Sequence, residues 1–283
     1  ESIQRDLEDA RQLLAMLRDE RAVEYEDWMR VGFVLNNISQ NSMEGVSLWN
    51  EFSKRAGSQY DEDSCIDRWE HLEVRSTPGL GTLVFLAKQD NAEMYMKFRD
   101  EKLGRKVEES LVTGGAHNDI AKMLHATHGT EFVCASVSSK TWYHFHSHSW
   151  EYIEEGTYLR AKISDANPGG VLHVYKQKIR DKERDIAEAD GECKKKTPES
   201  EKKMLEKIVK NLKCSPYKNN IMRECVEVFY DKKFRELLDQ NPNLVAFQNG
   251  VYDLNATWQT PDGQTRTGIF RAGLPDDYIS KKL

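Results

Sequence analysis

Histidines at alternate positions of a strand-like segment give this sequence one possible metal site. His144 and His146 would point to one face of a strand, and histidine is a common metal ligand. Ser147-His148 has the character of a turn, which would break the alternation at His148, and no carboxylate or cysteine stands nearby to complete a ligand set. We therefore expect no metal site, with His144 and His146 kept as the alternative.

A basic stretch offers a second kind of chemistry. Residues 176–235 carry 18 Lys and Arg against 12 Asp and Glu, whereas residues 1–75 carry 9 against 17, in a chain of net charge −6. Such a local excess suits a polyanion, because each phosphate contact adds salt-dependent affinity. The alternative is a solvated helix face, because glutamates alternate with the lysines. The candidate phosphate contacts are Lys194, Lys195, Lys196, Lys202, Lys203, Lys207 and Lys210.

Motifs for nucleotide hydrolysis and for primer synthesis are missing. A phosphate-cradling loop needs Gly-x-x-x-x-Gly-Lys-Ser/Thr, and the sequence contains no Gly-Lys pair. The run Asp61-Glu62-Asp63 has the two-residue spacing of metal-binding aspartates, but it opens a predicted helix, where acidic residues act as caps. We expect no catalytic residue and no cofactor in this chain.

Helical spacing dominates the first part of the chain. Apolar residues recur at three- and four-residue steps over 2–20, and the helices continue to about residue 90. Trp28, Trp49 and Trp69 have apolar neighbours at helical spacing, which favours a core role over stacking on bases. Residues 1–90 are therefore predicted to form a helical module.

The remainder mixes helices with short strands. Charged residues ending in Gly114-Gly115 predict a linker over 91–115, followed by an α+β domain over 116–283. Helices are expected over 175–238, with an interruption near 191–198. The predicted fold class is α+β and mostly helical, with a small antiparallel sheet. The strand-like segments are 132–137, 141–146, 149–153, 244–247 and 251–254.

The last two strand-like segments flank a turn signal. Asn249 and Gly250 both tolerate positive φ and form a natural two-residue hairpin turn. Asp253 is a candidate to cap or orient that turn rather than a catalytic residue. The turn is therefore interpreted as structural.

The composition indicates the cellular compartment of the chain. The sequence has no run of roughly 20 apolar residues, and its first residues are charged where a secretory signal would be apolar. Five widely spaced cysteines without a Cys-x-x-Cys pair indicate reduced thiols. An intracellular protein without a membrane partner is expected.

Two separate patches resemble one protein type. The first resembles the type-two primase C-terminal module, and the second resembles the segment before the poxvirus-type helicase ATPase. Their specificity comes from occurring together in this order. The first patch consists of Asp27-Trp28-Met29-Arg30-Val31-Gly32, Leu48-Trp49, Phe52-Ser53, Tyr60-Asp61 and Trp69, and the second of residues 244–254, Phe270-Arg271 and Pro275–Ser280, with Trp142-Tyr143 and Trp150 as early strands.

The resemblance implies a role in DNA replication at a viral replication site in the host cell. In primase-helicases of large DNA viruses, the region between primase and ATPase links the two, supports a hexameric ring and engages single-stranded or forked DNA. ATP and magnesium are then expected only in an ATPase domain beyond this chain, and other replication proteins are expected partners. The alternative is a stand-alone nucleic-acid-binding module that uses the basic segment 176–235.

Overall fold

The computed structural model describes residues 2–75, 77–259 and 264–281. Within them the chain is mostly helical, with two antiparallel three-stranded sheets, which confirms the predicted fold class. Contacts divide the chain into two compact units. Unit 1 is Glu1–Tyr95, Ser147–Ser149 and Asp239–Leu283, and unit 2 is Met96–His146 and Trp150–Leu238.

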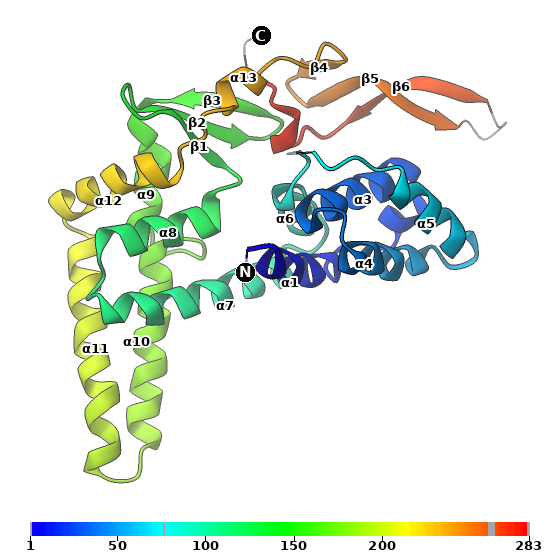
Figure 1. Ribbon diagram of the computed structural model, residues 1–283. Coiled ribbons are helices and arrows are strands. Elements are labelled where there is room, and N and C mark those ends of the chain that lie inside the picture. The colour runs from blue at the N-terminus through cyan, green and yellow to red at the C-terminus, as the bar shows by residue number, and fades with distance from the viewer. Residues whose placement is uncertain (1, 76, 260–263, 282–283) are drawn as a thin grey trace. The chain divides into compact units, whose positions relative to one another are not determined.

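Unit 1 begins with short helices packed around apolar side chains. The helix expected over 2–20 ends at Leu14, where the amides of Met16 and Leu17 bond to carbonyls three residues back, and the Arg18 amide then donates to the Asp90 carboxylate at 3.0 Å. The helices are α1 (Ser2–Leu14), α2 (Glu20–Val23), α3 (Tyr25–Ser39), α4 (Met43–Ser53), α5 (Glu62–Glu70) and α6 (Leu80–Asp90), with a 3-10 segment at Lys54–Gln59 between α4 and α5 (Figure 1).

Two of the three tryptophans of this module lie in its core, as predicted. Trp49 is fully buried and Trp69 is 5% exposed. Trp28 is half-buried and stacks on Trp49 with ring centroids 4.6 Å apart, while its indole nitrogen donates to the Ser53 hydroxyl at 2.7 Å. Packing and a satisfied N–H therefore account for these residues.

The predicted helix start at Asp61 is confirmed, but Asp61 does not cap the helix with its side chain. Its carboxylate accepts instead from the Ser64 hydroxyl at 2.6 Å. Glu62 and Asp63 occupy the first turn, where the positive end of the helix dipole favours acidic residues.

The second part of unit 1 is a sheet of β4 (Leu244–Phe247), β5 (Gly250–Gln259) and β6 (Thr265–Arg271). The predicted hairpin is displaced by one residue: Gln248 and Asn249 form the turn, and Gly250 pairs with Phe247. Neither Asn249 nor Gly250 has a positive φ. Glycine is required at 250 because a Cβ there would stand 2.6 Å from the Arg271 carbonyl oxygen.

Unit 2 combines the first sheet with long helices. Buried residues from all of these helices except the short α13, together with those of the sheet, form one core that includes Trp142 and Tyr175. The elements are α7 (Ala92–Val112), α8 (His117–His128), β1 (Phe132–Ser136), β2 (Thr141–His146), β3 (Ser149–Ile153), α9 (Thr157–Ile163), α10 (Val171–Glu188), α11 (Glu192–Leu212), α12 (Ser215–Val228) and α13 (Phe234–Leu237).

The predicted linker over 91–115 consists mostly of helix α7. The compact units also differ from the expected division, because residues 239–283 pack with the N-terminal helices. Whether 1–90 and 116–283 are separate domains stays a prediction.

Helices α10 and α11 pack side by side as a long hairpin (Figure 1). The expected interruption near 191–198 is shorter than predicted, since α11 starts at Glu192 and contains Pro198. Pro198 lies in the second turn of α11 and lacks the N–H that would bond to the carbonyl of residue 194.

Candidate nucleic-acid interface

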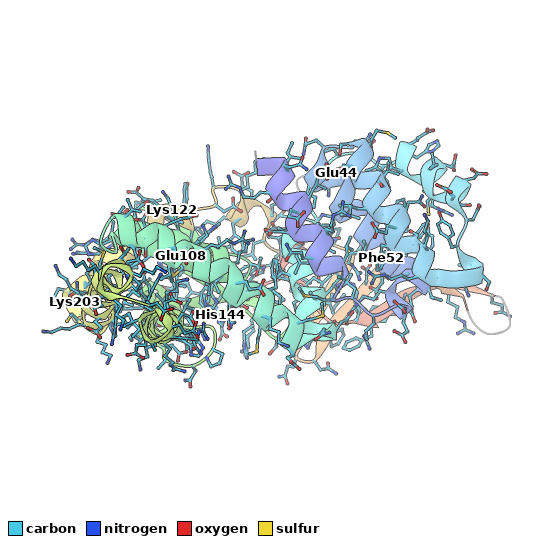
Figure 2. The ribbon with its side chains drawn as sticks, turned by 90° about the horizontal axis from the view of Figure 1, so that it is seen from below. Glu44, Phe52, Glu108, Lys122, His144 and Lys203 are labelled. Atoms are coloured by element: carbon cyan, nitrogen blue, oxygen red, sulfur yellow. The ribbon has the colours of Figure 1, made fainter. Side chains whose placement is uncertain are left out.

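The candidate lysines all lie on α11, but in different surroundings. Lys196, Lys203, Lys207 and Lys210 are exposed, and their spacing of seven, four and three residues places them on one helical face. Buried Leu205 is on the opposite face. Figure 2 shows Lys203 at the outer edge of the α10–α11 pair. We call these four residues the lysine face.

The ammonium groups of the lysine face are unpaired within the part of the chain that the structure describes. Among the described residues, none of its four ammonium groups has an ion-pair partner or a hydrogen-bond acceptor. Two exposed acids, Glu199 and Glu206, lie within one helical turn of the lysine face. Such a row resembles the exposed cationic stripe that neutralises phosphates.

Lys202, by contrast, is engaged within the hairpin. Its ammonium group lies 2.9 Å from a Glu183 carboxylate oxygen and 3.8 Å from Glu206, and these bonds raise the pKa of Lys202. On α10, Lys182 makes a matching ion pair with Glu201 at 2.7 Å. Lys202 and Glu201 therefore each pair across the hairpin, whereas Glu199 and Glu206 are exposed and alternate with the lysine face.

Lys194 and Lys195 stand at the start of α11, where Lys194 is exposed and Lys195 is half-buried. Their positions in the helical repeat lie outside the lysine face. The structure thus brings four of the seven predicted lysines together and leaves three apart.

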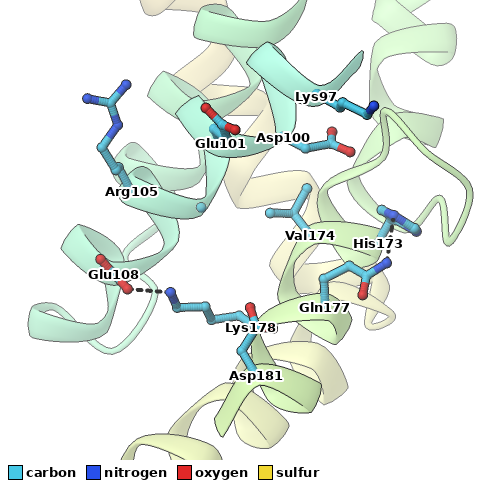
Figure 3. A pocket seen from close by; sticks show the side chains of 11 residues that line it. Lys97, Asp100, Glu101, Arg105, Glu108, His173, Val174, Gln177, Lys178 and Asp181 are labelled. Carbon is cyan, nitrogen blue, oxygen red and sulfur yellow. Dashed lines mark hydrogen bonds and ion pairs between the residues drawn. The ribbon is translucent and has the colours of Figure 1, made fainter. Parts of the chain in front are cut away.

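A polar groove of about 690 Å³ lies between α7 and α10 (Figure 3). Acidic and basic side chains alternate along it, and Lys178 of α10 pairs with Glu108 of α7 across it, which lowers the pKa of Glu108. Val174 is the apolar side chain drawn in its wall. Three basic and four acidic side chains line the groove, so it offers no basic excess for a nucleic acid.

The histidines do not converge on one point. His144 and His146 share a face of β2 with ring centroids 5.9 Å apart, and His144 also stacks on Phe132 at 4.3 Å. Burial lowers the pKa of His144. His148 instead accepts a hydrogen bond from the Gly273 amide at 3.1 Å. Within the described residues, no group of three potential ligands could hold a metal ion.

Asp253 lies on β5 and does not cap the hairpin turn. One of its carboxylate oxygens accepts from the amides of Asn255 and Ala256, both at 3.2 Å, where β5 changes register against β6. The other oxygen lies 3.3 Å from the Arg271 guanidinium. Asp253 therefore shapes a bulge and holds an arginine.

Sequence reasoning missed a network of buried ion pairs around Arg271. Its guanidinium donates to both carboxylate oxygens of Asp277, at 2.7 and 2.8 Å. Burial alone would lower the pKa of Arg271, but its bonds with Asp277 and Asp253 raise it. The signal was present, because Arg271 and Asp277 belong to the segments that carry the family resemblance.

The segment Pro275–Ser280 is held at three further points. The Thr82 hydroxyl of α6 donates to Asp276, and the backbone and hydroxyl of Ser280 donate to Asp239 at 2.7 and 2.6 Å. Burial raises the pKa of Asp276, since the bonds from Thr82 and the Gly79 backbone offset that effect only in part. These bonds anchor the segment after β6 onto helix α6 and onto the chain before β4.

Two family models match the chain. The model described as Primase C terminal 2 (PriCT-2) matches residues 10–87, and the model described as D5 N terminal like matches residues 121–283, more than half of the chain. The chain belongs to the D5 N terminal like family. The resemblance predicted from the two sequence patches is thereby confirmed.

Proteins of large DNA viruses are similar to this member of the family along nearly its whole length. "Putative helicase L207/L206" of Acanthamoeba polyphaga mimivirus is 30% identical over 275 residues, covering 97% of this chain and 26% of that protein. "Putative helicase 022R" of Frog virus 3 (isolate Goorha) is 30% identical over 296 residues, covering 95% of this chain and 29% of that protein. "Putative helicase 121R" of Invertebrate iridescent virus 3 is 27% identical over 315 residues, covering 100% of this chain and 32% of that protein. The chain thus spans between a quarter and a third of the length of these relatives.

Among the described residues, no helix has both the length and the apolar character needed to cross a membrane.

Proposed function

We propose that this D5-type chain is the non-catalytic central region of a viral DNA-replication primase-helicase. In that role it links primase to helicase, supports assembly of a hexameric ring and contacts single-stranded or forked DNA at the site of viral replication. The observation that carries the proposal is the order of the two family matches, with the PriCT-2 module before the D5 N terminal like region. Relatives named as putative helicases support it.

The lysine face supports the DNA-binding part of the proposal. Four ammonium groups along one helix, without a partner among the residues that the structure describes, suit a phosphate backbone, because their attraction does not depend on base sequence. The same observation favours the second candidate, a stand-alone nucleic-acid-binding module. The two differ in whether the parent gene also encodes an ATPase with a Gly-x-x-x-x-Gly-Lys-Ser/Thr motif.

Replacing the lysine face tests DNA binding. The test variant carries Lys196→Gln, Lys203→Gln, Lys207→Gln and Lys210→Gln. It should bind a fluorescent single strand of DNA more weakly than the parent chain does. The slope of log affinity against log salt concentration should become less steep by about 3, or roughly 0.7 for each phosphate contact. The matched control replaces the exposed Lys122, Lys140, Lys232 and Lys233 of unit 2 by Gln. Equal behaviour of the two variants would contradict a phosphate contact on α11.

An activity assay tests the non-catalytic part. The purified chain should not hydrolyse ATP above the rate measured without protein, because the sequence contains no phosphate-cradling Gly-Lys motif. It should not extend a primer either, because the Asp61-Glu62-Asp63 run opens helix α5 and is not a pair of metal-binding aspartates on a strand. Turnover that follows the protein through purification would refute this part and leave the DNA-binding proposal standing.

A further inference from the structure

A cavity of about 510 Å³ lies within unit 1, between helix α3, the chain before α6 and the segments that flank β5 and β6. Its volume falls in the range of small-molecule sites, roughly 300 to 1,000 Å³. We propose that this cavity binds a nucleoside phosphate, with the base against its apolar wall and the phosphate at Arg30. The site is separate from the lysine face of unit 2, so either proposal can fail alone.

Helix α3 supplies one wall with apolar and charged parts. Glu26, Met29, Arg30 and Phe33 recur at steps of three, one and three residues, which places them on one face of the helix. Met29 and Phe33 are half-buried and line the cavity together with Pro78. A flat, polarizable surface of this kind accepts the face of any base, because every base presents a π face.

Arg30 provides the donors for a phosphate. Its Nη1 donates to Asp27 at 2.7 Å, and its other N–H groups have no acceptor among the described residues. Burial, and then the nearby charge of Arg271, lower the pKa of Arg30. A bound anion would stabilise this half-buried guanidinium, because it would accept charge-assisted hydrogen bonds from the N–H groups that have no acceptor among the described residues.

Asparagine amides and one buried nitrogen complete the polar lining. The side chains of Asn243 and Asn255 have no hydrogen-bond partner among the described residues, and an amide can both donate to and accept from a base edge. The Nε of Arg271 is buried and has no acceptor in the described part of the chain. Such an unpaired buried donor is costly unless a ligand or water satisfies it.

Four acidic and three arginine side chains line the cavity, so an anion would bind there through the local donors at Arg30 and not through an overall positive charge. Asp253 and Asp277 share the single positive charge of Arg271, and Asp276 accepts from Thr82 while burial raises its pKa. Glu26 has no ion-pair or hydrogen-bond partner among the described residues and lies one helical turn from Arg30. Its charge should weaken phosphate binding, so its removal should strengthen it.

Calorimetric titration of the full chain with ATP, adenosine and inorganic phosphate tests the proposal. ATP should saturate one site, and adenosine or phosphate alone should bind at least about tenfold more weakly, since each makes only part of the contacts. A short oligonucleotide with a 5′-phosphate distinguishes a strand end from a free nucleotide as the natural source. No saturable binding of ATP or of the phosphorylated strand at millimolar concentration would overturn the proposal.

Two variants with opposite expected effects on ATP affinity test whether binding occurs in this cavity. Arg30→Gln should weaken ATP binding about tenfold or more, and Asp27 keeps Arg21 as a partner at 2.8 Å, so the fold should survive. Glu26→Gln should strengthen binding about two- to fivefold. The controls Arg5→Gln and Glu70→Gln change the same charges at exposed positions of α1 and α5. An unchanged affinity in Arg30→Gln, or equal effects in the controls, would refute the site.

Discussion

The two units use basic residues in opposite ways. On α11 of unit 2, the lysine face has exposed ammonium groups without partners among the described residues. In unit 1, Arg21 and Arg271 are buried or nearly so, and each binds two carboxylates. Lysine suits a mobile, hydrated contact, whereas the planar guanidinium suits fixed pairs of bonds.

The difference indicates which basic residues act on partners and which hold the fold. An exposed lysine costs little stability to replace, because water solvates its charge in the folded and unfolded chain alike. A buried arginine cannot be replaced without leaving its carboxylates unpaired. Substitutions in the two regions should therefore separate stability from binding.

The largest effect is expected for Arg271→Ala. The side chains of Asp253 and Asp277 are only 21% and 9% exposed, so the substitution leaves two largely buried carboxylates without their partner. We expect a loss of about 3 kcal/mol in the free energy of unfolding of unit 1. Hydrogen exchange of β5 and β6 amides in increasing urea measures it, and protection equal to that of the parent chain would show that the network contributes nothing.

Asp90→Asn should cost about 2 kcal/mol at neutral pH, because the fully buried carboxylate accepts four bonds from Arg18 and Arg21. Burial alone would raise the pKa of Asp90, but the bonds from Arg21 and Arg18 lower it. The stabilisation is therefore complete above the ordinary carboxyl pKa of about 4 and is lost as pH falls through the lower folded value. Urea unfolding at several pH values should show the gap between variant and parent closing in acid. A gap independent of pH would contradict the assignment.

Asp276→Asn should have a smaller effect of opposite sign. Burial raises the pKa of Asp276, so its proton stabilises the fold fully below the ordinary carboxyl pKa, and this stabilisation is lost as pH rises through the folded value. Asparagine keeps an oxygen for the Thr82 hydroxyl and has no charge to bury. The variant should be equal to or more stable than the parent at neutral pH, by less than about 1 kcal/mol. Urea midpoints at pH 5 and pH 8 measure this, with Asp67→Asn as an exposed control.

Local patterns in the sequence predicted the fold class, most elements and the family, but not the contacts between distant segments. Asp276 and Thr82 are 194 residues apart, and nothing in either segment indicates that they meet. The turn was predicted one residue too late because Asn249-Gly250 is typical of a turn with positive φ. In the structure Gly250 is needed for its close approach to the Arg271 backbone. The sequence alone provided no reason to rank the seven candidate lysines. Burial and ion pairs in the structure separate Lys202 from the lysine face.

The smallest effect on stability is expected from the variant of the lysine face that carries Gln at all four positions. The four side chains are exposed and have no partner among the described residues, so the free energy of unfolding should change by less than about 0.5 kcal/mol. Glutamine retains most of the helix propensity of lysine, which leaves the charge as the main change. Urea unfolding followed by circular dichroism measures it. A loss of several kcal/mol would mean that these lysines support the α10–α11 hairpin, and their effect on DNA affinity would then no longer report a contact.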